Sequence, residues 1–238
     1  MQSHVKQVVD PFLEAAHGAL GIGYSAVLYG SAARMEHVPK QSDINLLLIV
    51  PSLTPDVLAR LGGPFELLVG KTRTPPLLFT TAEWNRAADA FPIEITDMQV
   101  SHVALRGPDP VSALSVSKAD LRRALERELR GKLLRLRQGY ALFHSSPDEV
   151  ARVGIQSIAT IAILLRVGVA LSGSAPPVET VAALRAAGER MGFDDTVVAR
   201  WYEARRGEKG PGSDQFLAYL AAVEAALQYV DQFHVGGN

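Results

Sequence analysis

A turn segment near the middle of the chain, Gly107-Pro108-Asp109-Pro110, separates two parts whose apolar residues recur with different periods. Before it, short runs of Val, Leu and Ile lie between Gly, Ser and Pro, as buried strands do, and they alternate with helical patterns. After it, leucines recur at spacings of three and four, which is the pattern of one helix face. The sequence therefore predicts an α+β fold: an α/β domain with a mixed sheet over residues 1–112, followed by an all-α helical bundle over residues 113–238.

The composition restricts the class of protein. The chain has 238 residues, 47% of them hydrophobic, and a formal net charge of -1, so it carries no strong signal for nucleic acid or for an anionic membrane. It has no cysteine, which excludes disulfides and thiolate metal sites and is compatible with a reducing cytosol; we expect a cytoplasmic protein. The longest apolar stretch, residues 158–171, contains Arg166 and is shorter than the roughly 20 residues of a membrane span, so it predicts a buried helix.

Local patterns and capping residues predict the individual elements. In the first part we expect strands over residues 25–29, 44–50, 77–79, 92–98 and 102–106. Helices in that part are expected over 5–20, from Thr54-Pro55 onward and over 81–90. In the second part we expect helices from Ser117 or Asp120, from Pro147 to about Leu171, and over about 178–190, 194–205 and 214–233, with a polar loop over 206–213.

Two short polar motifs lie between the first and second predicted strands. Gly30-Ser31 follows the strand 25–29; a glycine lets the backbone approach a phosphate closely, and the serine can donate a hydrogen bond to it. Asp43 and Asn45 lie two residues apart at the start of the next strand, so their side chains should point to the same side. Glu94 lies between two isoleucines in the predicted strand 92–98, and we prefer it to the nearby Asp97, which a strand would point to the opposite face. If the two strands are neighbours, Asp43, Asn45 and Glu94 converge on one cation, and such oxygen ligands suit Mg²⁺.

These residues resemble the motifs of the nucleotidyltransferase superfamily, which includes DNA polymerase β and the aminoglycoside nucleotidyltransferases. The resemblance lies in Tyr29-Gly30-Ser31, Asp43-Ile44-Asn45 and Ile93-Glu94-Ile95, and it covers about residues 20–110. The helical half is similar in kind to the C-terminal bundle of the aminoglycoside enzymes. The resemblance implies Mg²⁺-dependent transfer of a nucleoside monophosphate from a nucleoside triphosphate to an acceptor hydroxyl. The implied roles are catalysis for Asp43 and Glu94, metal binding for Asp43, Asn45 and Glu94, and nucleotide binding for Gly30, Ser31 and Asn45.

Asn45 departs from the family pattern, because active members usually carry a second acid at this position. An amide oxygen coordinates a metal without bringing a negative charge. One alternative is therefore a catalytically degenerate nucleotide-binding or regulatory pseudoenzyme. Another is a protein-interaction module of the toxin–antitoxin kind carried by the helical half, and the sequence also leaves a homodimer open. Neither the base of the nucleotide nor the acceptor, small molecule or macromolecule, is revealed by the sequence.

A basic face accompanies the leucine face of the first helix in the second part. Arg123, Arg127, Arg130 and Arg137 lie about opposite the leucines, and the ordinary interpretation is a solvated face that pairs with Glu126 and Glu128. The alternative is a wall that contacts a triphosphate or a polyanionic acceptor, whose binding would weaken as salt rises. In the first part, His37 and His102 have no evident partner in the sequence.

Overall fold

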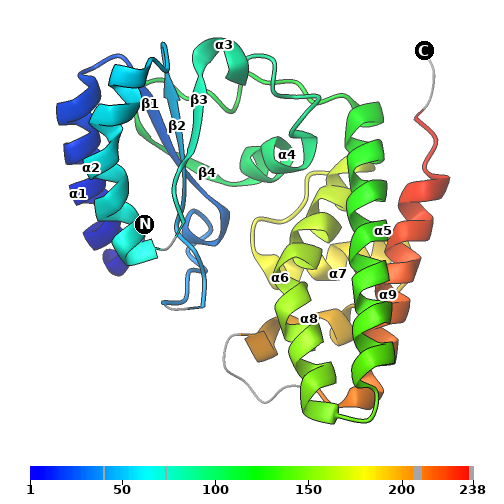
Figure 1. The fold of residues 1–238 in the computed structure, drawn as a ribbon. Coiled ribbons are helices and arrows are strands. Elements are labelled where there is room, and N and C mark those ends of the chain that lie inside the picture. Colours follow the sequence, from blue (N-terminus) through cyan, green and yellow to red (C-terminus); the bar gives the residue numbers. More distant parts are fainter. Residues whose placement is uncertain (40, 73, 206–210, 236–238) are drawn as a thin grey trace. The chain divides into compact units, whose positions relative to one another are not determined.

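The computed structural model describes residues 1–39, 41–72, 74–205 and 211–235 (Figure 1). Its contacts divide the chain into two compact units, Met1–Ser115 and Val116–Asn238. The first unit contains a sheet and helices α1 to α4, and the second contains helices α5 to α9. The chain is thus a mixed α+β protein.

A four-stranded sheet in the order β3-β2-β1-β4 forms the centre of the first unit. Its strands are β1 Ser25–Tyr29, β2 Asn45–Val50, β3 Leu77–Thr80 and β4 His102–Arg106. Strand β1 runs antiparallel to β2 and β4, whereas β2 and β3 are parallel, so the sheet is mixed as predicted. The register places Tyr29 opposite Asn45 on one side and His102 on the other. The residue before Gly30 therefore lies beside the first residue of β2.

Helices α1 Ser3–Leu20 and α2 Pro55–Thr72 pack against one face of this sheet (Figure 1). Thr54 accepts a hydrogen bond from the Val57 N–H at 3.3 Å, as expected of an N-cap. The core between helices and sheet includes three residues of the β2 segment, Ile44, Leu46 and Leu48. Asn45 alternates with these residues and therefore lies on the opposite face of the sheet.

The predicted strand over 92–98 is wrong, because this segment forms helix α4, Pro92–Val100. Its apolar residues are buried on several sides of the helix, and alternation cannot distinguish such a short buried run from a strand. Pro92 at the start favours the helix, since its fixed φ suits the first helical position. Glu94 and Asp97 are therefore not on opposite faces, as a strand would place them; three residues apart on a helix, they share one side.

The helix predicted over 81–90 is much shorter in the structure. Helix α3 spans only Thr81–Trp84, and a capping box stabilises its N-terminus. The Thr80 hydroxyl oxygen accepts from the Glu83 N–H at 3.1 Å, and the Glu83 carboxylate accepts from the Thr80 N–H at 2.8 Å.

The described residues of the second unit form helices without a strand. The helices are α5 Lys118–Phe143, α6 Pro147–Leu171, α7 Thr180–Met191, α8 Asp195–Arg205 and α9 Ser213–Gln232. The predicted leucine face of α5 is buried, and α6 packs against the four other helices. By length and composition alone α6 could cross a membrane, but 56% of its most apolar window is buried inside the structure, as expected of a core helix. Most of the loop predicted over 206–213 lies outside the described residues.

Candidate functional site

The Gly30–Ser31 turn contacts the start of β2. After β1 the chain enters a short 3-10 turn, Gly30–Ala32, in which Gly30 has a φ of 72°. A Cβ placed on Gly30 would lie 2.8 Å from the Asn45 amide nitrogen, so a larger residue would need both a strained backbone and a shift of the Asn45 side chain. The structure thus brings together two of the predicted nucleotide-binding residues. Ser31 is partly exposed, and its hydroxyl has no hydrogen-bond partner among the described residues.

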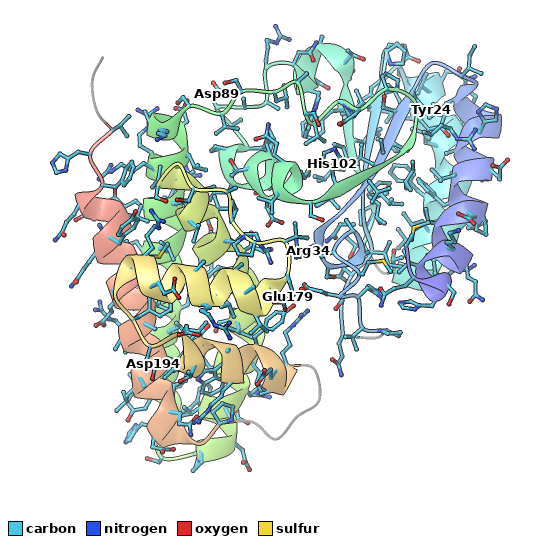
Figure 2. All side chains as sticks on the ribbon, turned by 180° about the vertical axis from the view of Figure 1, so that it is seen from behind. Tyr24, Arg34, Asp89, His102, Glu179 and Asp194 are labelled. Atoms are coloured by element: carbon cyan, nitrogen blue, oxygen red, sulfur yellow. The ribbon has the colours of Figure 1, made fainter. Side chains whose placement is uncertain are left out.

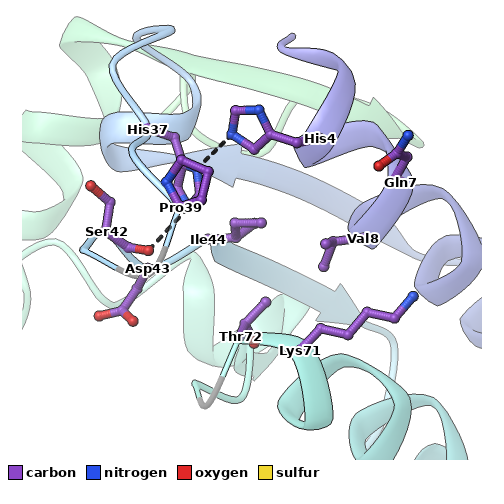
Figure 3. A pocket seen from close by; sticks show the side chains of 10 residues that line it. All are labelled: His4, Gln7, Val8, His37, Pro39, Ser42, Asp43, Ile44, Lys71 and Thr72. Atoms are coloured by element: carbon purple, nitrogen blue, oxygen red, sulfur yellow. Dashed lines mark hydrogen bonds between the residues drawn. The ribbon is translucent and has the colours of Figure 1, made fainter.

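Asp43 lies two residues before β2, where its side chain is exposed and lines a cavity of about 500 Å³ (Figure 3). Helix α1, the end of α2 and the segment before β2 supply the walls of this cavity. Its lining residues are His4, Gln7, Val8, His37, Pro39, Ser42, Asp43, Ile44, Lys71 and Thr72.

Two histidines hold the segment that carries Asp43. His37 lies 3.0 Å through Nε2 from the Ser42 carbonyl oxygen and 2.8 Å through Nδ1 from His4 Nε2 (Figure 3). A carbonyl only accepts, so His37 Nε2 carries the proton and Nδ1 accepts from His4. Burial and the neighbouring His4 lower the pKa of His37, opposed by its bond to Ser42 and by the charge of Asp43. His4 and His37 therefore connect α1 to the residue preceding Asp43.

Helix α4 brings two carboxylates close to the end of β1. Glu94 is exposed, whereas Asp97 is buried and forms an ion pair with Arg34 at 3.3 Å. Arg34 also lies 3.4 Å from the carboxylate of Glu36, and it comes three residues after Ser31 in the chain (Figure 2). Burial, and then the negative charges of Glu94 and Asp97, raise the pKa of Tyr29 to about 12. The charge of Glu94 thus affects the pKa of Tyr29, the residue before Gly30, from a helix rather than from a neighbouring strand.

Sequence reasoning missed Arg34 and set Asp97 aside. The arginine was visible four residues after Gly30, but nothing in the sequence indicated its acidic partner 63 residues away. Asp97 was set aside because a strand would have pointed it away from Glu94. A helical interpretation of 92–100 would have placed both acids on one side.

A magnesium ion needs oxygen ligands, and few of the described side chains near β2 supply them. The described ranges contain no group of three or more His, Asp or Glu side chains placed to hold a metal. Magnesium is commonly held by one or two carboxylates together with waters and substrate phosphates. The exposed carboxylate of Asp43 and the partly exposed amide oxygen of Asn45 fit that smaller requirement.

The basic face of α5 is paired, as the ordinary interpretation expected. Arg123 pairs with Asp120, and Arg127 lies 3.8 Å from Glu128. Arg130 lies 2.9 Å from Glu126 and Arg137 lies 2.8 Å from Glu224 of α9. Because these pairs are largely exposed, each contributes little to stability, about 0–1 kcal/mol.

Replacing Gly30 by Ala should destabilise the first unit, and the Asn45 side chain should account for part of the loss. The left-handed backbone costs Ala about 1–2 kcal/mol, and the contact with Asn45 adds to it. In an Asn45→Ala background the contact with Asn45 is gone, so Gly30→Ala should cost less free energy of unfolding there. We expect the two substitutions to be coupled by about 0.5–3 kcal/mol. Urea unfolding followed by Trp84 fluorescence in a Trp201→Phe background measures this, since the chain has only these two tryptophans. Equal costs of Gly30→Ala in both backgrounds would contradict the described contact.

Neutralising Glu94 should lower the pKa of Tyr29 below about 12, because one of the negative charges that disfavour the phenolate is removed. The measurement is a pH titration of the Tyr29 ring carbon in ¹³C-tyrosine-labelled protein, assigned with Tyr29→Phe. Glu66→Gln, an equal charge change on the exposed side of α2, serves as the control. An unchanged Tyr29 titration in Glu94→Gln would show that α4 does not bring this acid to the site.

The comparisons with known proteins bear on the fold. No protein-family model matches the chain, and the search of curated proteins gave no significant match. Among solved structures the chain is similar to spectinomycin adenyltransferase AAD(9) from Enterococcus faecialis, whose crystal structure contains ATP and spectinomycin. The match has a TM-score of 0.57 and 13% identity, and it covers 98% of this chain and 100% of the other. At that identity the likeness concerns the fold alone, and the mixed α+β architecture is compatible with a nucleotidyltransferase fold.

Proposed function

We propose that this protein transfers a nucleoside monophosphate from a nucleoside triphosphate to a hydroxyl group of an acceptor. The observation that carries the proposal is the Gly30 turn at the end of β1, which lies against Asn45 and is followed by Ser31, whose hydroxyl has no partner among the described residues. The turn thus presents a partly exposed serine hydroxyl, a donor suited to a phosphate oxygen. The fold likeness to an adenyltransferase supports the same reaction class.

Residues of the first unit account for the chemical groups that the reaction needs. Ser31 would donate to a phosphate oxygen of the triphosphate. Asp43 and Asn45 would hold a magnesium ion, which when bound offsets the negative charge of the phosphates. Glu94 is exposed and would accept the proton of the acceptor hydroxyl. The acceptor oxygen forms a bond to the α-phosphorus while the bond from that phosphorus to the bridging oxygen breaks, and pyrophosphate leaves.

Asp97 and Arg34 have a positioning role in this proposal. Their ion pair joins α4 to the segment after Gly30, and both side chains are nearly excluded from solvent, with 7% and 6% exposed. The ion pair would keep Glu94, which lies on the same side of α4 as Asp97, near the Gly30–Ser31 turn. Asp97 is therefore better suited to fixing the helix than to replacing Glu94 as the base.

The partners follow from the reaction. A nucleoside triphosphate and a small-molecule acceptor are proposed, by analogy with the ATP and spectinomycin of the similar structure. A cytoplasmic location fits both the triphosphate and the absence of cysteine. Four alanines of α9 form a face that would suit a protein-interaction module or a homodimer: Ala221, Ala222, Ala225 and Ala226. Ala222 and Ala226 are buried within the second unit, Ala225 is partly exposed and Ala221 is exposed, so internal packing uses about half of this face.

Asp43→Ala should abolish magnesium-dependent binding of nucleoside triphosphates, because it removes the one carboxylate of the proposed metal site. Calorimetry with ATP, GTP, CTP and UTP, each with and without Mg²⁺, measures the effect. Asp10→Ala removes an exposed acid of α1 and should leave binding unchanged. Binding that survives equally in both variants, or no binding of any triphosphate to the unaltered protein, would refute the proposed site.

The Asn45 amide favours a second candidate, a nucleotide-binding protein that has lost turnover. Asn45 lies against Gly30, and its amide brings no negative charge to the proposed metal site. If lost charge is the cause, Asn45→Asp should raise turnover by about 10²–10³-fold, the typical effect of one electrostatic group. Pyrophosphate release in the presence of candidate acceptors measures turnover, and Asn85→Asp, the same change at an exposed position, is the control. Tighter magnesium binding with no gain in turnover would argue against restored catalysis.

A further inference from the structure

A cavity of about 260 Å³ lies between helices α5 and α6, which run side by side in the second unit (Figure 1). Three residues of α5 and three of α6 line it: Lys132, Arg135, Leu136, Val153, Gln156 and Ser157. Lys132 and Arg135 are three residues apart on α5, so their side chains leave neighbouring turns on the same side. The cavity therefore receives two positive charges from one helix and polar groups from the other.

These two charges differ from the other cations of this stretch of α5. Acids of α5 and α9 neutralise the arginines on the remaining sides of the helix: Arg122, Arg123, Arg127, Arg130 and Arg137. Within the described ranges no acid lies within ion-pair distance of Lys132 or Arg135, and Glu149 of α6 pairs instead with Arg152. Like charges one turn apart repel each other, so this position favours an anion from outside the protein.

The walls of the cavity are held in place by close packing. A Cβ on Gly139 would lie 2.8 Å from Val153 Cγ1, so the two helices touch one turn beyond the cations. On α6, the Ser157 hydroxyl lies 2.8 Å from the Gly154 carbonyl oxygen and 2.9 Å from the hydroxyl of Tyr219. Tyr219 is fully buried and therefore fixes the position of Ser157. Hydrogen bonds within the second unit thus hold the α6 wall of the cavity in place.

We propose that this cavity binds a phosphate group. A lysine, an arginine and the Gln156 side-chain amide together offer several N–H donors and two positive charges, which match a phosphate dianion. The volume corresponds to about eight or nine waters at roughly 30 Å³ each. That size suits inorganic phosphate, pyrophosphate or the phosphate end of a larger small molecule, with the rest of such a molecule outside the cavity.

The test is calorimetry on the full chain with sodium phosphate, sodium pyrophosphate and AMP, in the absence of magnesium. The cavity variant is Lys132→Gln with Arg135→Gln. The control is Arg123→Gln with Arg127→Gln, which removes two charges from the same helix at paired positions whose side chains are 71% and 75% exposed. We expect affinity for the tightest of the three ligands to fall at least tenfold in the cavity variant and less than twofold in the control. Trp201 fluorescence shows whether each variant keeps the fold of the second unit.

Two results would overturn the proposal. Absence of binding of all three ligands at millimolar concentration is one, and equal weakening in both double variants, which would indicate only a general charge effect, is the other. Asp43→Ala should leave this binding intact, so failure of the proposed transferase site can be distinguished from failure of the cavity. Equal affinity for phosphate and AMP would identify free phosphate as the ligand, and tighter binding of AMP would identify a phosphorylated molecule.

Discussion

The pairing of β1 with β2 is the constraint on which the candidate site depends. Antiparallel pairing places Tyr29 opposite Asn45, so the chain must turn away from β1 at the level where β2 begins. Gly30 makes this turn with a positive φ, close to the Asn45 side chain. The sheet itself thus brings the predicted nucleotide-binding residues Gly30 and Asn45 together. Shifting the register by one residue would move Asn45 to the core face.

Ion pairs and hydrogen bonds from distant segments complete this arrangement. Arg34 attaches the segment after the turn to α4, and α4 in turn places two acids near Tyr29. On the other side, His37 attaches the segment before β2 to α1. The sheet therefore fixes where the site lies, whereas contacts between elements far apart in the sequence fix which charges surround it.

The sequence was sufficient for elements whose boundaries carry local signals. Strands β1 and β4 have the predicted bounds because glycine or serine lies next to each compact apolar run. Thr54 and Ser117 likewise cap the helices that they were expected to cap. Helix α4 was not predictable by alternation, because a nine-residue segment buried on most sides shows no clear period. The partners of Arg34, His37 and Arg137 were also out of reach, since each depends on tertiary contact rather than on spacing along the chain. The metal set and the two-domain boundary remain predictions.

The histidine connection makes the first turn of α1 part of the candidate site. Gln2 donates to the His37 carbonyl at 3.3 Å, and His4 donates to the His37 ring, so residues at the start of α1 hold the segment that leads to Asp43. Substitutions of Gln2 or His4 that remove these bonds therefore act on the geometry of Asp43 from a distant part of the sequence. A change of activity in such a variant would not identify either residue as catalytic, because its effect reaches Asp43 only through His37.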